Sequence, residues 1–236
     1  MAIEEMEHPI MSGEGVITIY RDGNHRYWTL DDTTKRPSVT SVIGHVSGDT
    51  FGAGVGWATK QTKLHNDPDA PKRVGEQARQ EGEQLHKDIS NFIYTSGGAI
   101  AESPAFNAWH KAMGNLIFLG SELFIYHPTL KYGGTLDQVA LDGDKIIIQD
   151  VKSVDPESWA KYGAKLRRAK DWAQVSAYIT ALQAMNSKYT TPHAQIVYVM
   201  RDGSGVEIED VDTNIGFNVF KASMTLYELN KELNNG

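Results

Sequence analysis

The chain has 236 residues, a formal net charge of −7 and no cysteine, and 40% of its residues are hydrophobic. The absence of cysteine excludes disulfides, a cysteine nucleophile and thiolate metal ligands. The acidity weighs against a protein whose whole surface binds nucleic acid, but it leaves room for a local basic groove.

The first residues do not resemble a targeting signal. Residues 1–10, MAIEEMEHPI, are acidic and weakly apolar, unlike a secretory signal or an organelle transit peptide. No apolar run approaches the roughly 20 residues that span a bilayer. We therefore expect a cytoplasmic protein that makes no contact with a membrane.

The N-terminal part predicts a hairpin followed by helices. Residues 16–30 alternate around Asp22-Gly23-Asn24, which is typical of a hairpin turn. Pro37 predicts a turn, and Ser38 or Thr40 would cap a short helix. The helices expected next are a weak one near residues 57–60, after a glycine-rich stretch at 48–56, an amphipathic one over 73–95, and, after an interruption at 96–103, one over 104–114.

From residue 115 onwards the hydrophobic period changes to two. The segments 116–128, 133–142 and 144–150 read as strands, and Asp142-Gly143-Asp144 forms a tight turn between the last two. A helical stretch over 156–187, a strand over 193–203 and a helix over 214–234 follow. We therefore expect one α/β domain over 1–236, with the hairpin and first helices in 1–115 and a mixed sheet with flanking helices in 116–236.

The stretch IIIQDVKS, residues 146–153, ends an apolar strand in charged residues. Because alternate strand residues face the same way, Asp150 and Lys152 point to one spot. The preceding hairpin would bring Asp137 near Asp150. Two close carboxylates repel each other unless a cation lies between them, and oxygen ligands suit Mg²⁺ or Mn²⁺. Metal-assisted phosphodiester hydrolysis would use this set of residues, whereas an edge salt bridge and a turn aspartate are the structural alternatives.

Five motifs resemble, in order, the RecB-like exonuclease branch of the PD-(D/E)XK nuclease superfamily. They are Gly82-x-x-x-His86, Glu122 in SELFIY, Gly134-x-x-Asp137, Asp150-x-Lys152 and Gln174-x-x-x-Tyr178. PSVTSVI at 37–43 is similar to the entry segment of phage and mitochondrial-maintenance exonucleases of this branch. Leu136 stands where the superfamily name has proline. The resemblance covers about residues 75–180 and implies a restriction-endonuclease-like core, with a central mixed sheet flanked by helices.

The resemblance also implies roles for individual residues. The implied ligands of Mg²⁺ or Mn²⁺ are His86, Asp137, Asp150 and the carbonyl of Val151. The implied catalytic residues are Asp137, Asp150, Lys152, Glu122, Gln174 and Tyr178, with Lys152 positioning or deprotonating a water molecule. The structural alternatives are a surface histidine at 86, an exposed strand glutamate at 122, and packing of a helix on the sheet at 174 and 178.

Basic and hydroxyl side chains near these motifs could contact DNA. The candidates are Lys35, Arg36, Ser38, Thr40, Lys161, Lys165, Arg167, Arg168 and Tyr178. Phosphate contacts by such residues give affinity that does not depend on base sequence. A solvated basic face is the structural alternative for the run that begins at Lys161.

The sequence therefore predicts a metal-dependent DNA exonuclease that acts on single strands or DNA ends in recombination, repair or end-processing. The resemblance implies a bacterial or phage-infected cell and fits a single-strand annealing or helicase partner. Two alternatives stay open: an endonuclease, structure-specific or non-specific, with the same core, and a DNA-binding protein that keeps the fold without catalysis.

Overall fold

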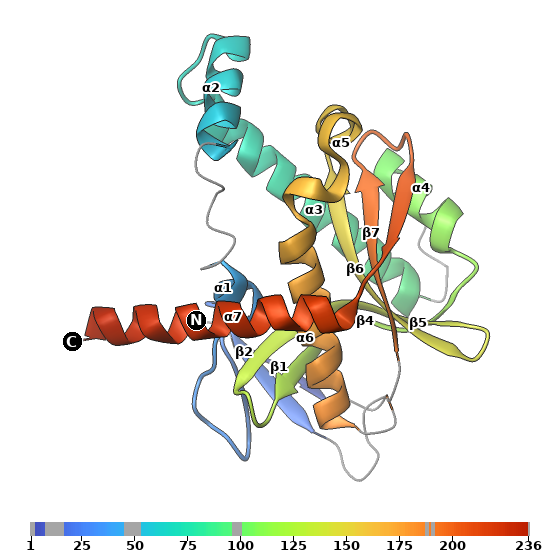
Figure 1. Ribbon diagram of the computed structural model, residues 1–236. Helices are drawn as coiled ribbons and strands as arrows, with labels where there is room; N and C mark the ends of the chain where they lie inside the picture. Colours follow the sequence, from blue (N-terminus) through green and yellow to red (C-terminus); the bar gives the residue numbers. More distant parts are fainter. Residues whose placement is uncertain are drawn as a thin grey trace.

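The computed structural model describes residues 3–7, 17–44, 53–95, 101–186, 189 and 192–235, arranged as two sheets with packed helices (Figure 1). The larger sheet has the strand order β4-β5-β6-β7-β8. Its strands are β4 (Ile117–His127), β5 (Tyr132–Asp142), β6 (Lys145–Val154), β7 (His193–Met200) and β8 (Val206–Asp210). Strands β6 and β7 are parallel and the other neighbours are antiparallel. The expected α/β class, a mixed sheet flanked by helices, is confirmed.

The smaller sheet is antiparallel and contains β1 (Ile3–Glu7), β2 (Thr18–Asp22) and β3 (Tyr27–Thr29). Strands β2 and β3 form the hairpin that the alternating pattern predicts. Strand β1 was not expected, because its sequence IEEME offers one large apolar side chain besides Ile3. That side chain, Met6, packs against the small core that contains Phe124 of β4.

Eight helical segments accompany the sheets in the described part of the chain. They are α1 (Val39–Ile43), α2 (Ala53–His65), α3 (Ala70–Tyr94), α4 (Pro104–Met113), α5 (Pro156–Tyr162), the 3₁₀ turn η1 (Gly163–Leu166), α6 (Arg168–Met185) and α7 (Thr213–Asn235). Helix α3 begins three residues earlier than expected, because proline is well tolerated in a first turn and Pro71 lies there. The stretch expected as one helix over 156–187 is divided, because Gly163 leaves the helical region with φ +54°.

The helices cover both faces of the larger sheet. Helix α6 packs on one face with α7 lying across it, and α3 and α4 pack on the other (Figure 1). The two cores reflect this: Ile148 and Ile196 belong to the α6 side, and Val151 and Val197 to the α3 and α4 side. The β5–β6 hairpin therefore lies between α3 and α6, two helices that carry sequence motifs.

Within the described ranges, none of the helices has the length and apolar character needed to span a membrane. Residues 45–52 and 96–100, which hold most of the glycine-rich stretch and most of the interruption after the long helix, lie outside the described residues.

Gly133 lets the segment before α1 approach the start of β5. Its amide donates a hydrogen bond to the carbonyl of Pro37 at 3.1 Å, and a Cβ added here would overlap the side chain of Tyr27. Overpacking of this kind costs about 1 to 3 kcal/mol. We expect Gly133→Ala to lower the free energy of unfolding by at least that amount in urea titration. Gly205→Ala is the matched control, since a Cβ there meets open space; equal stability of the two variants would contradict the close approach.

Candidate active site

The β5–β6 hairpin places two aspartates at the same end of its ladder. Gln138 and Gln149 form the last pair of the antiparallel register, and Asp137 and Asp150 are the next residues on the two strands. The backbone N–H of Val151 donates a hydrogen bond to Asp137 Oδ2 at 2.7 Å. This bond replaces a regular ladder contact and fixes one oxygen of Asp137 at the edge of the hairpin.

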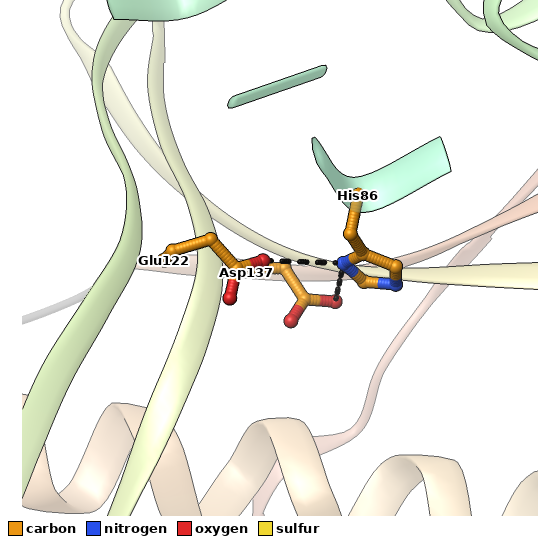
Figure 2. A group of neighbouring side chains, drawn as sticks. All are labelled: His86, Glu122 and Asp137. Atoms are coloured by element: carbon orange, nitrogen blue, oxygen red, sulfur yellow. Dashed lines mark hydrogen bonds and ion pairs between the residues drawn. The ribbon is translucent and has the colours of Figure 1, made fainter. Parts of the chain in front are cut away.

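His86, Glu122 and Asp137 converge from three elements, α3, β4 and β5 (Figure 2). His86 Nδ1 lies 3.3 Å from Glu122 Oε1 and 3.8 Å from Asp137 Oδ2. One ligand atom from each of the three lies within 4.8 Å of the others. Gly82, one turn earlier on α3, would place an added Cβ 3.8 Å from Ser153 on β6, so the helix lies close to the sheet there.

Glu122 has an unusual backbone conformation for a strand residue. Its φ is +54°, in the left-handed region. The other non-glycine residues with positive φ in the described chain, His25, Asn66 and Lys131, lie in turns or loops. Such a conformation costs about 1 to 3 kcal/mol and persists only where the surroundings enforce it. At Glu122 it accompanies a side chain that contacts His86.

Lys152 is held from two sides. Its Nζ lies 2.7 Å from Asp150 Oδ2 and donates to Gln174 Oε1 at 3.2 Å. Gln174 Nε2 in turn donates to the hydroxyl oxygen of Tyr178 at 2.8 Å. The Gln-x-x-x-Tyr spacing on α6 therefore forms a chain of contacts that ends at the lysine. Tyr178 is buried beside Gly134, where an added Cβ would lie 2.7 Å from the ring.

Burial and charge shift the titration of these groups. Burial raises the pKa of Asp150 to about 7, although Lys152 opposes the rise. Burial also raises the pKa of Asp137 against the pull of His86 and Lys152. For His86, burial lowers the pKa, but Asp137 and Glu122 outweigh it and raise the pKa to about 9. Burial lowers the pKa of Lys152 too, yet Asp150 and Asp137 more than compensate. Both bases thus retain their protons at neutral pH.

The donor set fits a divalent cation. Two carboxylates and an imidazole converge, and such oxygen and nitrogen ligands bind hard or borderline divalent metals. Asp150 is not part of this cluster. It is fully buried, and neither of its oxygens accepts a hydrogen bond of ordinary geometry from the described residues. The proton that His86 retains offsets part of the negative charge of these carboxylates.

The cluster opens into a cleft of about 710 Å³. The cleft lining includes the implied site residues His86, Glu122, Asp137, Val151, Lys152, Gln174 and Tyr178, and the DNA-binding candidates Ser38, Thr40 and Arg167. Asp150 is buried and is not among these lining residues. Ser38 caps α1 by accepting from the amide of Ser41, so the capping residue is the first of the two that the sequence offered, while Thr40 is inside the helix.

The remaining DNA-binding candidates lie outside the cleft lining in the described chain. Lys35 pairs with Asp22 at 2.8 Å and Arg36 with Asp32 at 3.1 Å. Arg168 donates to Glu209 at 2.5 Å, whereas Lys161 and Lys165 are exposed. The structure thus brings together the motif residues and separates them from most of the basic run.

Arg21, Tyr27, Thr135 and Asp171 are among the cleft and near-cleft residues that the sequence did not single out. Arg21 and Tyr27 of the small sheet share Thr135 of β5 as a hydrogen-bond partner and line the cleft. Asp171, fully buried, accepts from Arg167 Nε at 2.5 Å. The i, i+4 spacing of that pair was a usable signal. The contacts of Arg21 and Tyr27 were not predictable, because they join elements more than 100 residues apart.

Fold and cleft together define a mixed α/β protein with a candidate divalent-cation site. No family model matches the chain, and no curated protein matches it. Among solved structures it is similar to an alkaline exonuclease, LHK-Exo, from Laribacter hongkongensis, with a TM-score of 0.42 and 11% identity over 85% of this chain and 94% of that one. The same exonuclease in complex with dAMP gives a TM-score of 0.38 and 14% identity over 85% and 90%. At these values the chemistry of the cleft has to be judged from its own residues.

The strain at Glu122 can be measured by substitution. Glycine adopts positive φ without steric cost, so Glu122→Gly should unfold with a free energy about 1 kcal/mol higher than Glu122→Gln. Glu207, an exposed residue of β8 without a positive φ, provides the matched pair. There Gly should be the less stable variant, by about 0.5 to 1 kcal/mol. Chemical denaturation of the four variants gives both differences, and the same sign at both positions would contradict the strain.

Divalent-cation binding should depend on pH, because a ligand must lose its proton before it binds a metal. With the pKa of His86 raised to about 9, that proton is displaced on binding at every lower pH. We expect the apparent affinity for Mn²⁺ to rise from pH 6 to about 9 and then to level off, as measured by calorimetric titration. His86→Gln should weaken binding and flatten the curve, whereas His65→Gln, an exposed residue of α2, should leave it unchanged. A flat wild-type profile would contradict the assignment of His86.

Proposed function

We propose that this protein is a divalent-metal-dependent deoxyribonuclease that removes nucleotides from DNA ends. The observation that carries the proposal is the convergence of His86, Glu122 and Asp137 in one cleft with the ammonium of Lys152. Two carboxylates and a nearby fixed cation are what metal-assisted phosphodiester hydrolysis requires. The five motifs that resemble RecB-like exonucleases support action at ends rather than within the strand.

The proposed ligands of Mg²⁺ or Mn²⁺ are His86, Glu122 and Asp137, with Asp150 and the carbonyl of Val151 completing the set. When bound, the metal would supply Lewis acidity and lower the pKa of water. The N–H of Val151 keeps Asp137 Oδ2 oriented toward the cluster. The motif resemblance implies a catalytic role for Glu122, and its contact with His86 supports a place among the ligands.

Lys152 would orient the attacking water and neutralise charge that develops on the phosphate. Its raised pKa keeps it an ammonium, so hydrogen-bond donation and electrostatic stabilisation are the roles open to it at neutral pH, rather than proton abstraction. Gln174 fixes its direction, and Tyr178 fixes Gln174. We assign Gln174 and Tyr178 to this support.

The proposed DNA path runs from the cleft toward the exposed basic residues. Ser38 and Thr40 would hydrogen-bond the DNA backbone at the cleft, and Lys161 and Lys165 would meet phosphates farther along. Lys35, Arg36 and Arg168 would contribute weakly, because each is already paired with a carboxylate. We place this activity in recombination, repair or end-processing in the cytoplasm of a bacterial or phage-infected cell, with a single-strand annealing or helicase partner.

A substrate panel tests the activity. Linear and closed circular DNA, each single- and double-stranded, are incubated with Mg²⁺, with Mn²⁺ or with EDTA, and products are separated on denaturing gels. We expect mononucleotides or short products from linear DNA, no cleavage of closed circles, and no activity in EDTA. Cleavage of closed circles would contradict the exonuclease proposal and support the endonuclease alternative. Binding without cleavage under all conditions would favour the non-catalytic alternative.

Variants at the cleft test the assignment of residues. Lys152→Ala removes the ammonium that stabilises charge on the phosphate, so the rate should fall about 10²- to 10³-fold. Asp150→Ala should be similarly inactive because Lys152 loses its contact at 2.7 Å. DNA binding, measured by fluorescence anisotropy, should change little in either variant. Lys111→Ala, an exposed residue of α4, is the control. Full activity of both cleft variants would show that the site lies elsewhere.

A further inference from the structure

Arg167 differs from the other basic residues around it. Among the described residues of the run that begins at Lys161, it is the one that lines the cleft with Lys152 and the cation cluster. Its side chain is about one third exposed, whereas Lys161 and Lys165 are exposed residues of the surface. It stands immediately before α6, where the 3₁₀ turn passes into the helix. The folded core therefore fixes the position of Arg167, in contrast to the exposed lysines of the same run.

A buried carboxylate fixes the guanidinium of Arg167. Arg167 Nε donates to Asp171 Oδ2 at 2.5 Å, and the hydroxyl of Tyr198 on β7 donates to the same oxygen at 3.2 Å. Asp171 is fully buried in the first turn of α6. The guanidinium carbon also lies 5.6 Å from the centre of the Tyr198 ring. Asp171 and the Tyr198 ring therefore hold one edge of the guanidinium against α6 and β7, and the Tyr198 hydroxyl holds Asp171 in place.

The other edge of the guanidinium is left for a ligand. Asp171 engages Nε, and neither Nη nitrogen of Arg167 has a hydrogen-bond partner among the described residues. Two parallel N–H groups on a rigid planar fork match the oxygens of a phosphate, and a fork that is already oriented loses little entropy on binding. Oδ1 of Asp171 accepts no hydrogen bond in the described chain. Burying this carboxylate would destabilise the fold unless Arg167 stays paired with it.

We propose that Arg167 binds a phosphate of the DNA backbone directly beside the reacting one, and that Asp171 and Tyr198 are positioning residues for it. The inference rests on the proposed nuclease function and adds a specific phosphate clamp to it. Arg167 then contributes through bidentate geometry, whereas Lys161 and Lys165 contribute through charge alone. A lysine at position 167 would keep the charge but lose the fork.

Steady-state cleavage of a single-stranded oligonucleotide in Mg²⁺ tests the clamp. Arg167→Ala should lower kcat/KM about 10- to 100-fold, the range expected for losing charged hydrogen bonds. Arg167→Lys should recover only a small part of that loss. Lys170→Ala, an exposed residue of α6 that is absent from the cleft lining, removes the same charge and should stay within about twofold of the wild type. Equal losses in Arg167→Ala and Lys170→Ala, or full rescue by lysine, would overturn the clamp.

A double-mutant cycle tests the positioning role. Asp171→Asn should approach the loss seen in Arg167→Ala, mainly in KM, and the double variant should be no worse than Arg167→Ala alone. Multiplicative losses would overturn the tether. Should Asp171→Asn fail to fold, Tyr198→Phe removes one hydrogen bond to Asp171 and keeps the ring, and it should also lose activity only when Arg167 is present. Thermal unfolding of each variant checks for a general loss of structure.

The outcome separates this inference from the function on which it rests. Wild-type cleavage with an unaffected Arg167→Ala variant overturns the clamp and leaves the nuclease assignment standing. A wild type that cleaves no DNA overturns the nuclease assignment. Anisotropy with the same oligonucleotide then decides on the clamp: a loss of affinity in Arg167→Ala but not in Lys170→Ala supports it, and equal affinities reject it.

Discussion

Burial of the Asp150 carboxylate is the constraint on which the cleft depends. A charge withdrawn from water must be neutralised or paired, and burial is the main cause that raises the pKa of Asp150 to about 7. Lys152, at 2.7 Å, is the cation that opposes this shift. Because the pair lies on β6 two residues apart, satisfying Asp150 also turns the ammonium of Lys152 toward α6, where Gln174 receives it. The position of Lys152 in the cleft therefore follows from the need to pair a buried carboxylate.

The same cleft contains features that a protein optimised for stability alone would avoid. Glu122 holds a left-handed backbone within a strand, and His86 carries a proton between two carboxylates. Strain and crowded charge of this kind concentrate at functional sites. A divalent cation would balance the charge of the carboxylates, and a bond from Glu122 to it would offset the backbone strain at that residue. These costs are easier to explain as preparation for a ligand than as requirements of folding.

Much of this arrangement could be predicted from local pattern. The period of two over residues 116–150 gave three strands, and the i, i+2 rule put Asp150 and Lys152 on one face, where the two side chains do meet. The pattern could not predict the left-handed backbone conformation of Glu122, because the φ of this residue depends on how β4 pairs with β5. Strand β1 escaped because it is short and acidic, and its pairing is supplied by β2. Local patterns lose predictive power where a residue's conformation is imposed by a distant segment.

Basic residues show this limit most clearly, because the sequence shows where they are but not which carboxylates pair with them. Lys35, Arg36 and Arg168 looked like phosphate contacts, yet each is paired with a carboxylate that lies outside the cleft lining. Within the cleft, the partners of Lys152 and Arg167 are buried carboxylates. The partners of Arg21 and Arg79, which also line the cleft, are exposed glutamates. A buried partner cannot exchange with water, so it orients its cation without removing it from the cleft. An acidic protein can in this way present oriented cations inside a cleft while its surface as a whole repels polyanions, which favours binding of one anion placed in the cleft over general adhesion to nucleic acid.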